Sequence, residues 1–171
     1  MSTMKFYGTD HMVELFSAGG KSIGKWMAYN NIDSGYARKH YGGQLHLTNG
    51  TYTFLDTTAP HTHLDDAPSS SFGLYGILRF NYPKHPGVGV HSGRAHEKVA
   101  PGPLHATHGC IRTTDAAMAA IKAHIATDKL TTIEITGNDK VKAHHGKAKL
   151  HKIVYPGEDI SNLLHHNYLP V

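Results

Sequence analysis

One segment of this chain has clear helical periodicity, while the rest alternates short apolar runs with glycine-rich turns. Within residues 115–126, the apolar residues Met118, Ile121 and Ile125 recur at helical spacing. Thr113-Thr114 directly before this segment favours a helix start. Many short strands with one good helix predict a mainly β domain, sandwich-like, with that helix packed against it.

The expected strands are short and bounded by turn-forming clusters. Residues 12–16 and 22–29 flank Ala18-Gly19-Gly20, which predicts a β-hairpin. Residues 130–136 alternate, with Ile133 and Ile135 on one face. Further strands are expected at residues 6–7, 50–55, 72–81, 87–91 and 150–155, loops at 30–43, 56–71 and 91–107, and a short C-terminal helix at 156–164.

Length and composition point to one globular domain over residues 1–171. The 171 residues are 39% hydrophobic and 18% charged, and no apolar run approaches the roughly 20 residues of a membrane span. The formal net charge is +4, and the 16 histidines would add charge as pH falls through about 6.5. We therefore expect mild attraction to anionic partners.

Basic residues concentrate near the C-terminus. Residues 140–152 hold five lysines and three histidines without the interleaved aromatic residues of a single-stranded nucleic-acid platform. This pattern predicts a solvated basic face, or a surface for an acidic wall polymer or acidic partner, and no nucleic acid. At the other end, residues 1–6 lack a basic patch followed by an apolar run, so we expect no Sec signal peptide.

The only cysteine, Cys110, lies in the stretch Thr107-His108-Gly109-Cys110-Ile111-Arg112. A single cysteine forms no internal disulfide, which suits a reducing compartment but also permits a reactive thiol. Because the expected helix follows closely, its positive N-terminal end should favour the thiolate of Cys110. The alternative is that Cys110 is a small buried hydrophobic residue, the commonest role of a lone cysteine.

A cysteine nucleophile needs a base, a group that orients the base, and donors for the developing oxyanion. His91, at the end of an expected strand, is the candidate base, and the backbone carbonyl of Ser92 is the nearest candidate orienting group. The N–H groups of Gly109 and Cys110 are expected to face the oxyanion. The planar cation of Arg112 suits a substrate carboxylate.

These residues resemble the signature of the L,D-transpeptidase (YkuD-type) family. That signature is a histidine, a spacer, Ser or Thr, His-Gly-Cys, an apolar residue, and Asn or Arg. Here His91 precedes residues 107–112 by a spacer of 15 residues. Residues 72–76 also resemble the family's glycine-rich strand start, and 90–93 its histidine-containing strand end. The resemblance covers about residues 50–136 and leaves 137–171 as a basic extension.

The resemblance implies a β-rich fold and a cysteine acyltransferase or carboxypeptidase that acts on peptidoglycan tetrapeptide stems without metal or cofactor. Cys110 would attack the bond between meso-diaminopimelate and terminal D-alanine to form a thioester, after His91 takes the thiol proton. An amine resolves the thioester in crosslinking or D-amino-acid exchange, and water resolves it in carboxypeptidase action. Implied supporting residues are Ser92, His108 and Gly109 in catalysis, and Arg112, Thr107 and Tyr75 in substrate binding.

The chain departs from the family motif at one place and shows a second resemblance near its N-terminus. Thr113-Thr114-Asp115 follows the arginine, where the family commonly has apolar residues or asparagine. The N-terminal strand pair, with Gly42-Gly43 and residues 49–52, resembles compact relatives delivered as antibacterial type VI secretion effectors. This resemblance implies a protein made in the cytoplasm that acts in the periplasm of a target bacterium. Its partners would be a secretion-system component and an immunity protein.

Two alternatives remain: a non-catalytic relative that binds the wall, and a histidine-rich metal-binding module. Residues 61–66 contain two histidines and two aspartates, which are able ligands, but their spacing matches no closed zinc pattern. A polar loop is therefore the preferred interpretation there. Histidines interpreted in the same way, as solvated, are His85, His96, His105, His144-His145 and His165-His166.

Overall fold

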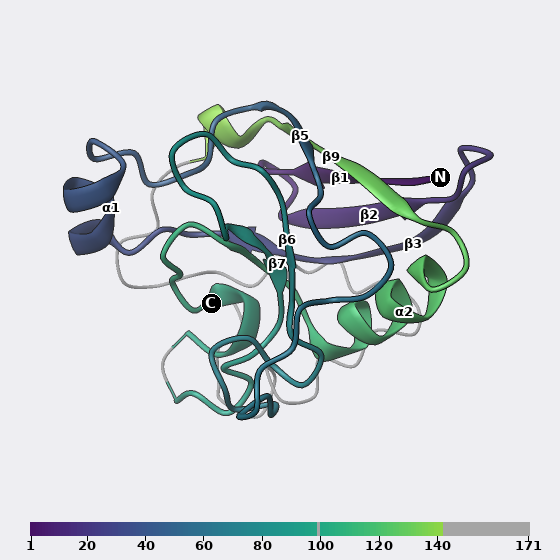
Figure 1. Ribbon diagram of the computed structural model, residues 1–171. Coiled ribbons are helices and arrows are strands. Elements are labelled where there is room, and N and C mark those ends of the chain that lie inside the picture. Colours follow the sequence, from purple (N-terminus) through teal and green to yellow (C-terminus); the bar gives the residue numbers. More distant parts are fainter. Residues whose placement is uncertain (99, 142–171) are drawn as a thin grey trace.

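A computed structural model describes residues 1–98 and 100–141, and its fold is mainly β (Figure 1). Its strands are β1 (Ser2–Tyr7), β2 (Met12–Phe16), β3 (Ser22–Met27), β4 (Tyr29–Asn30), β5 (Gly50–Thr53), β6 (Ile77–Arg79), β7 (Gly89–His91), β8 (Ile111–Arg112) and β9 (Leu130–Thr136). Its helices are α1 (Ser34–His40), α2 (Asp115–Ile125) and the short 3₁₀ turns η1 (Gly102–Leu104) and η2 (Asn138–Lys140). The expected strand at 150–155 and helix at 156–164 lie outside the described residues.

The strands form two sheets. The larger sheet has the order β3-β2-β1-β9-β5, and the smaller has the order β4-β8-β7-β6. The predicted hairpin is confirmed, because β2 and β3 pair antiparallel. In the smaller sheet β7 and β8 run parallel, with His91 opposite Arg112. This pairing brings the end of β7 beside the segment that contains the cysteine.

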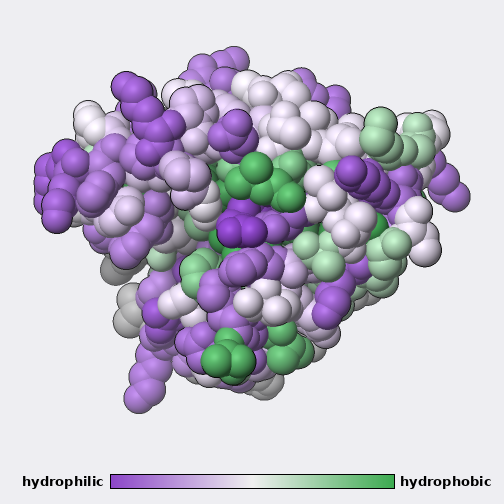
Figure 2. Space-filling model, in the orientation of Figure 1, coloured by the Kyte–Doolittle hydropathy of each residue, from purple (hydrophilic) through white to green (hydrophobic). Residues whose placement is uncertain are grey.

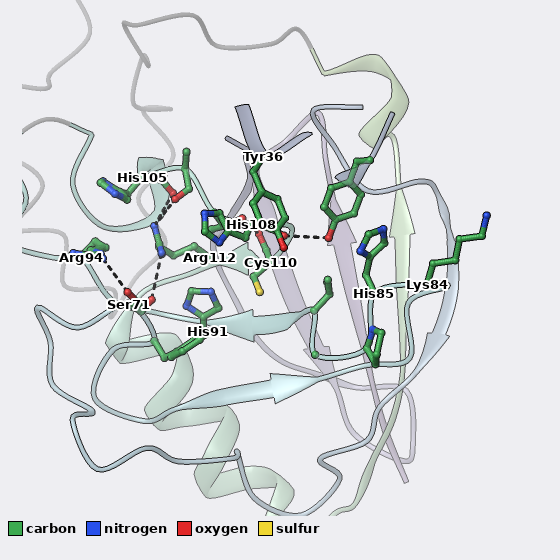
Figure 3. A pocket seen from close by; sticks show the side chains of 17 residues that line it. Tyr36, Ser71, Lys84, His85, His91, Arg94, His105, His108, Cys110 and Arg112 are labelled. Carbon is green, nitrogen blue, oxygen red and sulfur yellow. Dashed lines mark hydrogen bonds between the residues drawn. The ribbon is translucent and has the colours of Figure 1, made fainter. Parts of the chain in front are cut away.

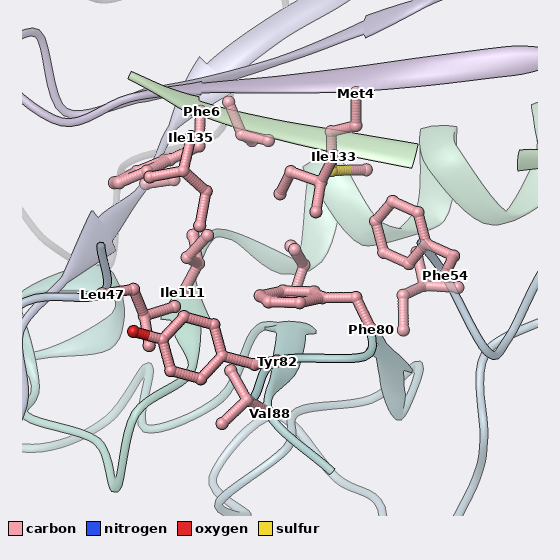
Figure 4. Packing of buried hydrophobic residues seen from close by; sticks show 14 of the residues in the cluster. Met4, Phe6, Leu47, Phe54, Phe80, Tyr82, Val88, Ile111, Ile133 and Ile135 are labelled. Atoms are coloured by element: carbon pink, nitrogen blue, oxygen red, sulfur yellow. The ribbon is translucent and has the colours of Figure 1, made fainter. Parts of the chain in front are cut away.

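A single hydrophobic core fills the space between the sheets (Figure 4). Met4 and Ile133 from the larger sheet pack toward Phe80 and Ile111 on the opposite side, and all four side chains are at most 1% exposed. Each such buried side chain stabilises the fold by about 1.5–3 kcal/mol. The two-sheet packing and the inward face of Ile133 agree with the sandwich-like fold predicted from alternation.

The predicted helix is confirmed as α2. The Thr114 hydroxyl accepts a hydrogen bond from the Ala117 N–H at 3.2 Å and so caps the helix start. The buried face of α2 comprises Ala117, Met118, Ile121 and Ile125, which belong to the common core. Among the described residues, no helix is long and apolar enough to cross a membrane.

Two local predictions are wrong. Residues 30–43, expected as a loop, contain α1, which begins where the Asp33 carboxylate accepts the Tyr36 N–H at 2.8 Å. This helix is too short for its periodicity to stand out, and only Ala37 is buried in it. The strand expected over 72–81 shrinks to β6, because Gly73 and Gly76 adopt positive φ angles and turn the chain before residue 77.

Candidate active site

Two strand ends bring Cys110 and His91 to one cavity. His91 is the last residue of β7, Cys110 immediately precedes β8, and these two strands are neighbours. Both residues line a cavity of about 620 Å³. In Figure 3 the sulfur of Cys110 points toward the imidazole of His91. The sheet register therefore brings together the two residues that the sequence analysis proposes as nucleophile and base.

The imidazole of His91 is held in one orientation. Its Nδ1 lies 2.6 Å from the backbone carbonyl oxygen of Ser92, which only accepts, so Nδ1 carries the proton. This is the contact expected from the sequence. Burial, reinforced by the charge of Arg112, lowers the pKa of His91 to about 3, while the Ser92 carbonyl acts in the opposite direction. At neutral pH the ring is uncharged, and its Nε2 can accept a proton.

The thiol of Cys110 is protonated at rest. Burial raises its pKa to about 11, although a backbone hydrogen bond with Gly89 and the charge of Arg112 act in the opposite direction. The expectation of a thiolate favoured by a helix start is therefore wrong. Strand β8 and Thr113 separate Cys110 from α2, so the thiol lies outside the first turn where the helix dipole acts.

The turn at residues 107–110 is closed by its own threonine. The Thr107 hydroxyl donates to the Cys110 carbonyl at 2.8 Å and accepts the Gly109 N–H at 3.2 Å. Because that N–H already has an acceptor, the expectation that Gly109 donates to an oxyanion is corrected, and the Cys110 N–H remains the candidate. Gly109 has φ +131°, and a side chain there would overlap the Tyr41 hydroxyl.

Two buried asparagines that sequence reasoning missed fix the same turn. The Asn30 amide donates to the carbonyls of Gly109 at 2.9 Å and Cys110 at 3.2 Å. Its oxygen accepts from the Asn138 amide at 2.9 Å. Asn138, near the start of the expected basic extension, is only 1% exposed. No local signal marks these residues, because their partners are 79 and 108 positions away.

Arg112 is buried beside the site, where it ties two loops together. One terminal nitrogen, Nη1, donates to the His105 carbonyl at 2.7 Å, and Nη2 donates to the Ser71 carbonyl at 3.3 Å. Burial lowers the pKa of Arg112 to about 10, which leaves it cationic at neutral pH. The side chain therefore supplies positive charge to the cavity, while loop carbonyls already occupy part of its predicted carboxylate-binding fork.

The remaining cavity wall is aromatic and basic. No aspartate or glutamate lines it among the described residues. Cationic or titratable groups lie on both sides of the thiol in Figure 3, with Arg94 and His105 on one side and Lys84 and His85 on the other. His85 and His105, interpreted from sequence as solvated, thus belong to the site. Lining residues that sequence reasoning missed are Tyr36, Tyr41, Ser71, Phe72, Lys84 and Arg94.

Helix α1 contributes to the site through stacked rings. Tyr36 stacks on His108 with ring centroids 4.0 Å apart, and the Tyr41 hydroxyl donates to the His108 carbonyl at 3.1 Å. The predicted site residue His108 therefore lines the cavity, held from the α1 side. Tyr75, expected to bind substrate, does not line this cavity. Its ring packs against the core, with the Lys122 ammonium 5.7 Å from its centroid.

Residues 61–66 form no metal centre. Within residues 1–98 and 100–141, no group of three or more His, Cys, Asp or Glu side chains is arranged to hold a metal ion. The ring of His63 instead stacks on Phe72 with centroids 4.6 Å apart, and the Asp66 carboxylate accepts the His63 N–H at 2.8 Å. His144-His145 and His165-His166 lie outside the described residues.

Comparison with known proteins gives matches in structure only. No family model matches the sequence, and no curated protein matches it. In fold, the chain is similar to an L,D-transpeptidase from Stackebrandtia nassauensis, at 17% identity and a TM-score of 0.48, covering 80% of this chain and 56% of that one. It is also similar to L,D-transpeptidase 1 of Mycobacterium tuberculosis, at 15% identity and TM-score 0.48, covering 78% of this chain and 60% of that one.

A third similar structure is the helical cell shape determining protein Pgp2 of Campylobacter jejuni, at 14% identity and a TM-score of 0.48, covering 78% of this chain and 46% of that one. The chain thus spans about half of the length of these three proteins. At such identities and TM-scores, the chain's own residues must carry any functional conclusion. Of these three similar structures, two are L,D-transpeptidases and one is a cell-shape determining protein.

Proposed function

We propose that this protein is a cysteine-dependent acyltransferase that acts on peptidoglycan tetrapeptide stems. The observation that carries the proposal is the pairing in one cavity of the Cys110 thiol with a neutral His91, whose Nδ1 proton is bound to the Ser92 carbonyl. Because Nδ1 carries the proton, Nε2 is the ring nitrogen whose lone pair can accept the thiol proton. A protonated thiol and a neutral imidazole are the starting state for general-base catalysis.

The chemistry follows from these two groups. As Sγ of Cys110 attacks the carbonyl carbon of the scissile bond, the thiol proton passes to Nε2 of His91. The tetrahedral intermediate collapses, the carbon–nitrogen bond breaks, and the leaving amine takes that proton from the imidazolium. A thioester on Cys110 remains. An amine or water then attacks the thioester, giving exchange or crosslinking in one case and a trimmed stem in the other.

The charge of the cavity favours an acidic peptide. Arg94 and Arg112 lie on one side of the thiol and Lys84 on the other, and no acidic side chain lines the wall among the described residues. The Arg94 guanidinium is paired with Glu97 at 3.1 Å, whereas the hydrogen bonds of Arg112 go to backbone carbonyls, so its charge is not neutralised by a carboxylate among the described residues. A stem peptide with carboxylates on both sides of the scissile bond fits this distribution.

The test is mass spectrometry of purified tetrapeptide muropeptides after incubation with the protein, with and without an added D-amino acid. The wild-type protein is expected to produce tripeptide or the exchanged stem, and Cys110→Ala is expected to produce neither while keeping its fold. If Cys110→Ala is as active as wild type, the mechanism is wrong. If wild type binds sacculi without altering them, the alternative of a non-catalytic wall-binding protein replaces it.

The biological setting is a separate part of the proposal: an antibacterial effector injected into the periplasm of a target bacterium. It predicts that expression with a periplasmic leader is toxic to a Gram-negative host, that cytoplasmic expression is harmless, and that Cys110→Ala removes the toxicity. Equal growth with and without the leader would remove the effector role and leave the acyl-transfer chemistry untouched.

A further inference from the structure

We propose that Asp115 is a positioning residue for the base, holding His91 in its reactive orientation through the side chain of Ser92. The effect of Asp115 on catalysis rests on the proposed function, whereas its effect on the orientation of His91 does not. The sequence shows no acid near His91. In the structure, Asp115, the first residue of α2, is connected to His91 through Ser92. Two hydrogen bonds link His91 to Asp115 through Ser92, and His91 lines the same cavity as the Cys110 thiol.

The backbone carbonyl and the side-chain hydroxyl of Ser92 both form hydrogen bonds. Its backbone carbonyl holds Nδ1 of His91 at 2.6 Å, and its hydroxyl donates to Oδ1 of Asp115 at 2.5 Å. The same carboxylate oxygen accepts the Leu74 N–H at 3.1 Å. Ser92 is 1% exposed and His91 is 2% exposed, so the bond between them is buried. The carboxylate therefore fixes the residue whose carbonyl selects the histidine tautomer.

The surrounding backbone is shaped around this contact. Gly73 has φ +75°, and a side chain there would overlap the Ser92 hydroxyl and lie 2.8 Å from Oδ1 of Asp115. Gly93 has φ +107°, and a side chain there would overlap the Ser70 carbonyl. Only glycine fits both positions without strain. The loop before β6 thus closes directly over the bond between Ser92 and Asp115.

A purely structural role for Asp115 is the competing explanation, because acidic residues stabilise the first turn of any helix. The cap of α2, however, is already made by Thr114, whose hydroxyl accepts the Ala117 N–H. The Asp115 carboxylate is directed away from the helix, toward Ser92 and Leu74. A structural role would change stability alone, whereas positioning would change the tautomer and the turnover rate.

The first measurement needs no substrate. The ¹⁵N chemical shifts of His91 in labelled protein at neutral pH report which ring nitrogen carries the proton. Wild type is expected to show the Nδ1–H tautomer alone, and Asp115→Ala a mixture of both tautomers. Asp115→Asn, which keeps an acceptor for the Ser92 hydroxyl, should remain close to wild type. A His91 spectrum unchanged in Asp115→Ala would overturn the inference.

The second measurement is turnover of tetrapeptide muropeptide. Asp115→Ala is expected to lower kcat by about tenfold with KM unchanged, which lies within the range for coupled neighbouring residues. Ser92→Ala removes the same bond from its other side, so the double variant should lose no more than Asp115→Ala alone. Additive losses in the double variant would contradict the proposed link, and Ser92→Ala alone tests the link if Asp115→Ala does not fold.

Asp128→Asn is the matched control. Asp128 accepts the Ala18 N–H at 2.8 Å and pairs with the N-terminus, so its loss affects stability away from the cavity. It should leave both kcat and the His91 tautomer unchanged. If wild type is inactive but Asp115→Ala still alters the tautomer, the proposed function fails and the positioning role stands. If wild type is active and Asp115→Ala changes neither readout, only the positioning role fails.

Discussion

At the scale of single residues, burial sets the protonation states of Cys110 and His91, the candidate reactive pair. Cys110 and His91 are both uncharged at neutral pH, because burial raises the pKa of the thiol to about 11 and lowers that of the imidazole to about 3. A preformed thiolate–imidazolium pair would show the opposite shifts. Under the proposed function, the thiol proton passes to His91 during attack on the substrate, and the resting thiol is expected to react slowly.

Alkylation of Cys110 tests this protonation state. The rate with iodoacetamide should rise about tenfold per pH unit between pH 6 and 9, because the thiolate fraction grows by that factor below the pKa. Mass spectrometry of the adduct measures the rate, and Cys110→Ala, which lacks the only cysteine, is the control. A rate that is already constant from pH 5 upward would indicate a preformed ion pair.

Acid should destabilise the fold through His91. In the unfolded chain this residue binds a proton below about pH 6.5, but in the folded protein only near pH 3. The unfolded state therefore binds more protons between these values, and the free energy of unfolding falls as pH decreases, by up to about 1.4 kcal/mol per pH unit. Urea unfolding at several pH values should show a shallower decrease for His91→Asn, and equal slopes would contradict this assignment.

At the scale of elements, the reactive turn depends on strands and helices far away in sequence. Asn30 of β4 donates to the Gly109 carbonyl in the turn at residues 107–110, and Asn138 of η2 donates to the Asn30 oxygen. Helix α1 supports the turn from the other side, where Tyr36 stacks on His108. Geometry at the thiol is thus set by elements that carry no reactive group themselves.

Loss of the Asn138 amide should lower both the stability of the fold and the turnover that depends on Cys110. Asn138→Ala removes one of two donors to the Asn30 oxygen, which keeps the Leu47 N–H, and removes the amide donor to the buried Leu47 carbonyl. It should therefore lower the free energy of unfolding by about 1–3 kcal/mol. The loosened turn should also lower kcat while KM changes little. Chemical denaturation and muropeptide turnover measure the two effects. Substitution of the exposed Asn81 by alanine is the control. Wild-type turnover in Asn138→Ala would show that the two asparagines do not influence the candidate active site.

At the scale of the whole molecule, positive charge gathers around the cavity. The face shown in Figure 2 is largely hydrophilic over α1, whose last turn carries Arg38, Lys39 and His40. Lys84, from the loop between β6 and β7, extends this charge to the cavity wall. An acidic substrate should be attracted over this surface before it reaches the thiol.

Removal of Lys84 tests that attraction. Lys84→Ala should raise KM for tetrapeptide muropeptide several-fold with kcat unchanged, and the difference should shrink as ionic strength rises, because exposed charges are screened. Lys21→Ala, an exposed lysine at the β2–β3 hairpin, serves as the control with the same change in net charge. Equal KM values for the two variants would show that only overall charge matters.

Local sequence patterns were sufficient to predict the mainly β class, the β2–β3 hairpin and helix α2, and they marked Cys110 and His91 as the candidate reactive pair. These follow from local causes: alternation, turn chemistry, helical spacing, and a motif within one short segment. The sequence also suggested the Ser92 carbonyl as the orienting group, since that carbonyl is adjacent to His91 in the chain.

The protonation states and orientation of Cys110 and His91 depend on three-dimensional packing. The pKa directions of Cys110 and His91 depend on burial, which no local pattern contains. Asn138 and Asp115 act on the site through partners brought close by sheet pairing and helix packing, and the same packing keeps Tyr75 out of the cavity. A residue type shows what chemistry is available, but desolvation and long-range contacts decide its protonation state and orientation.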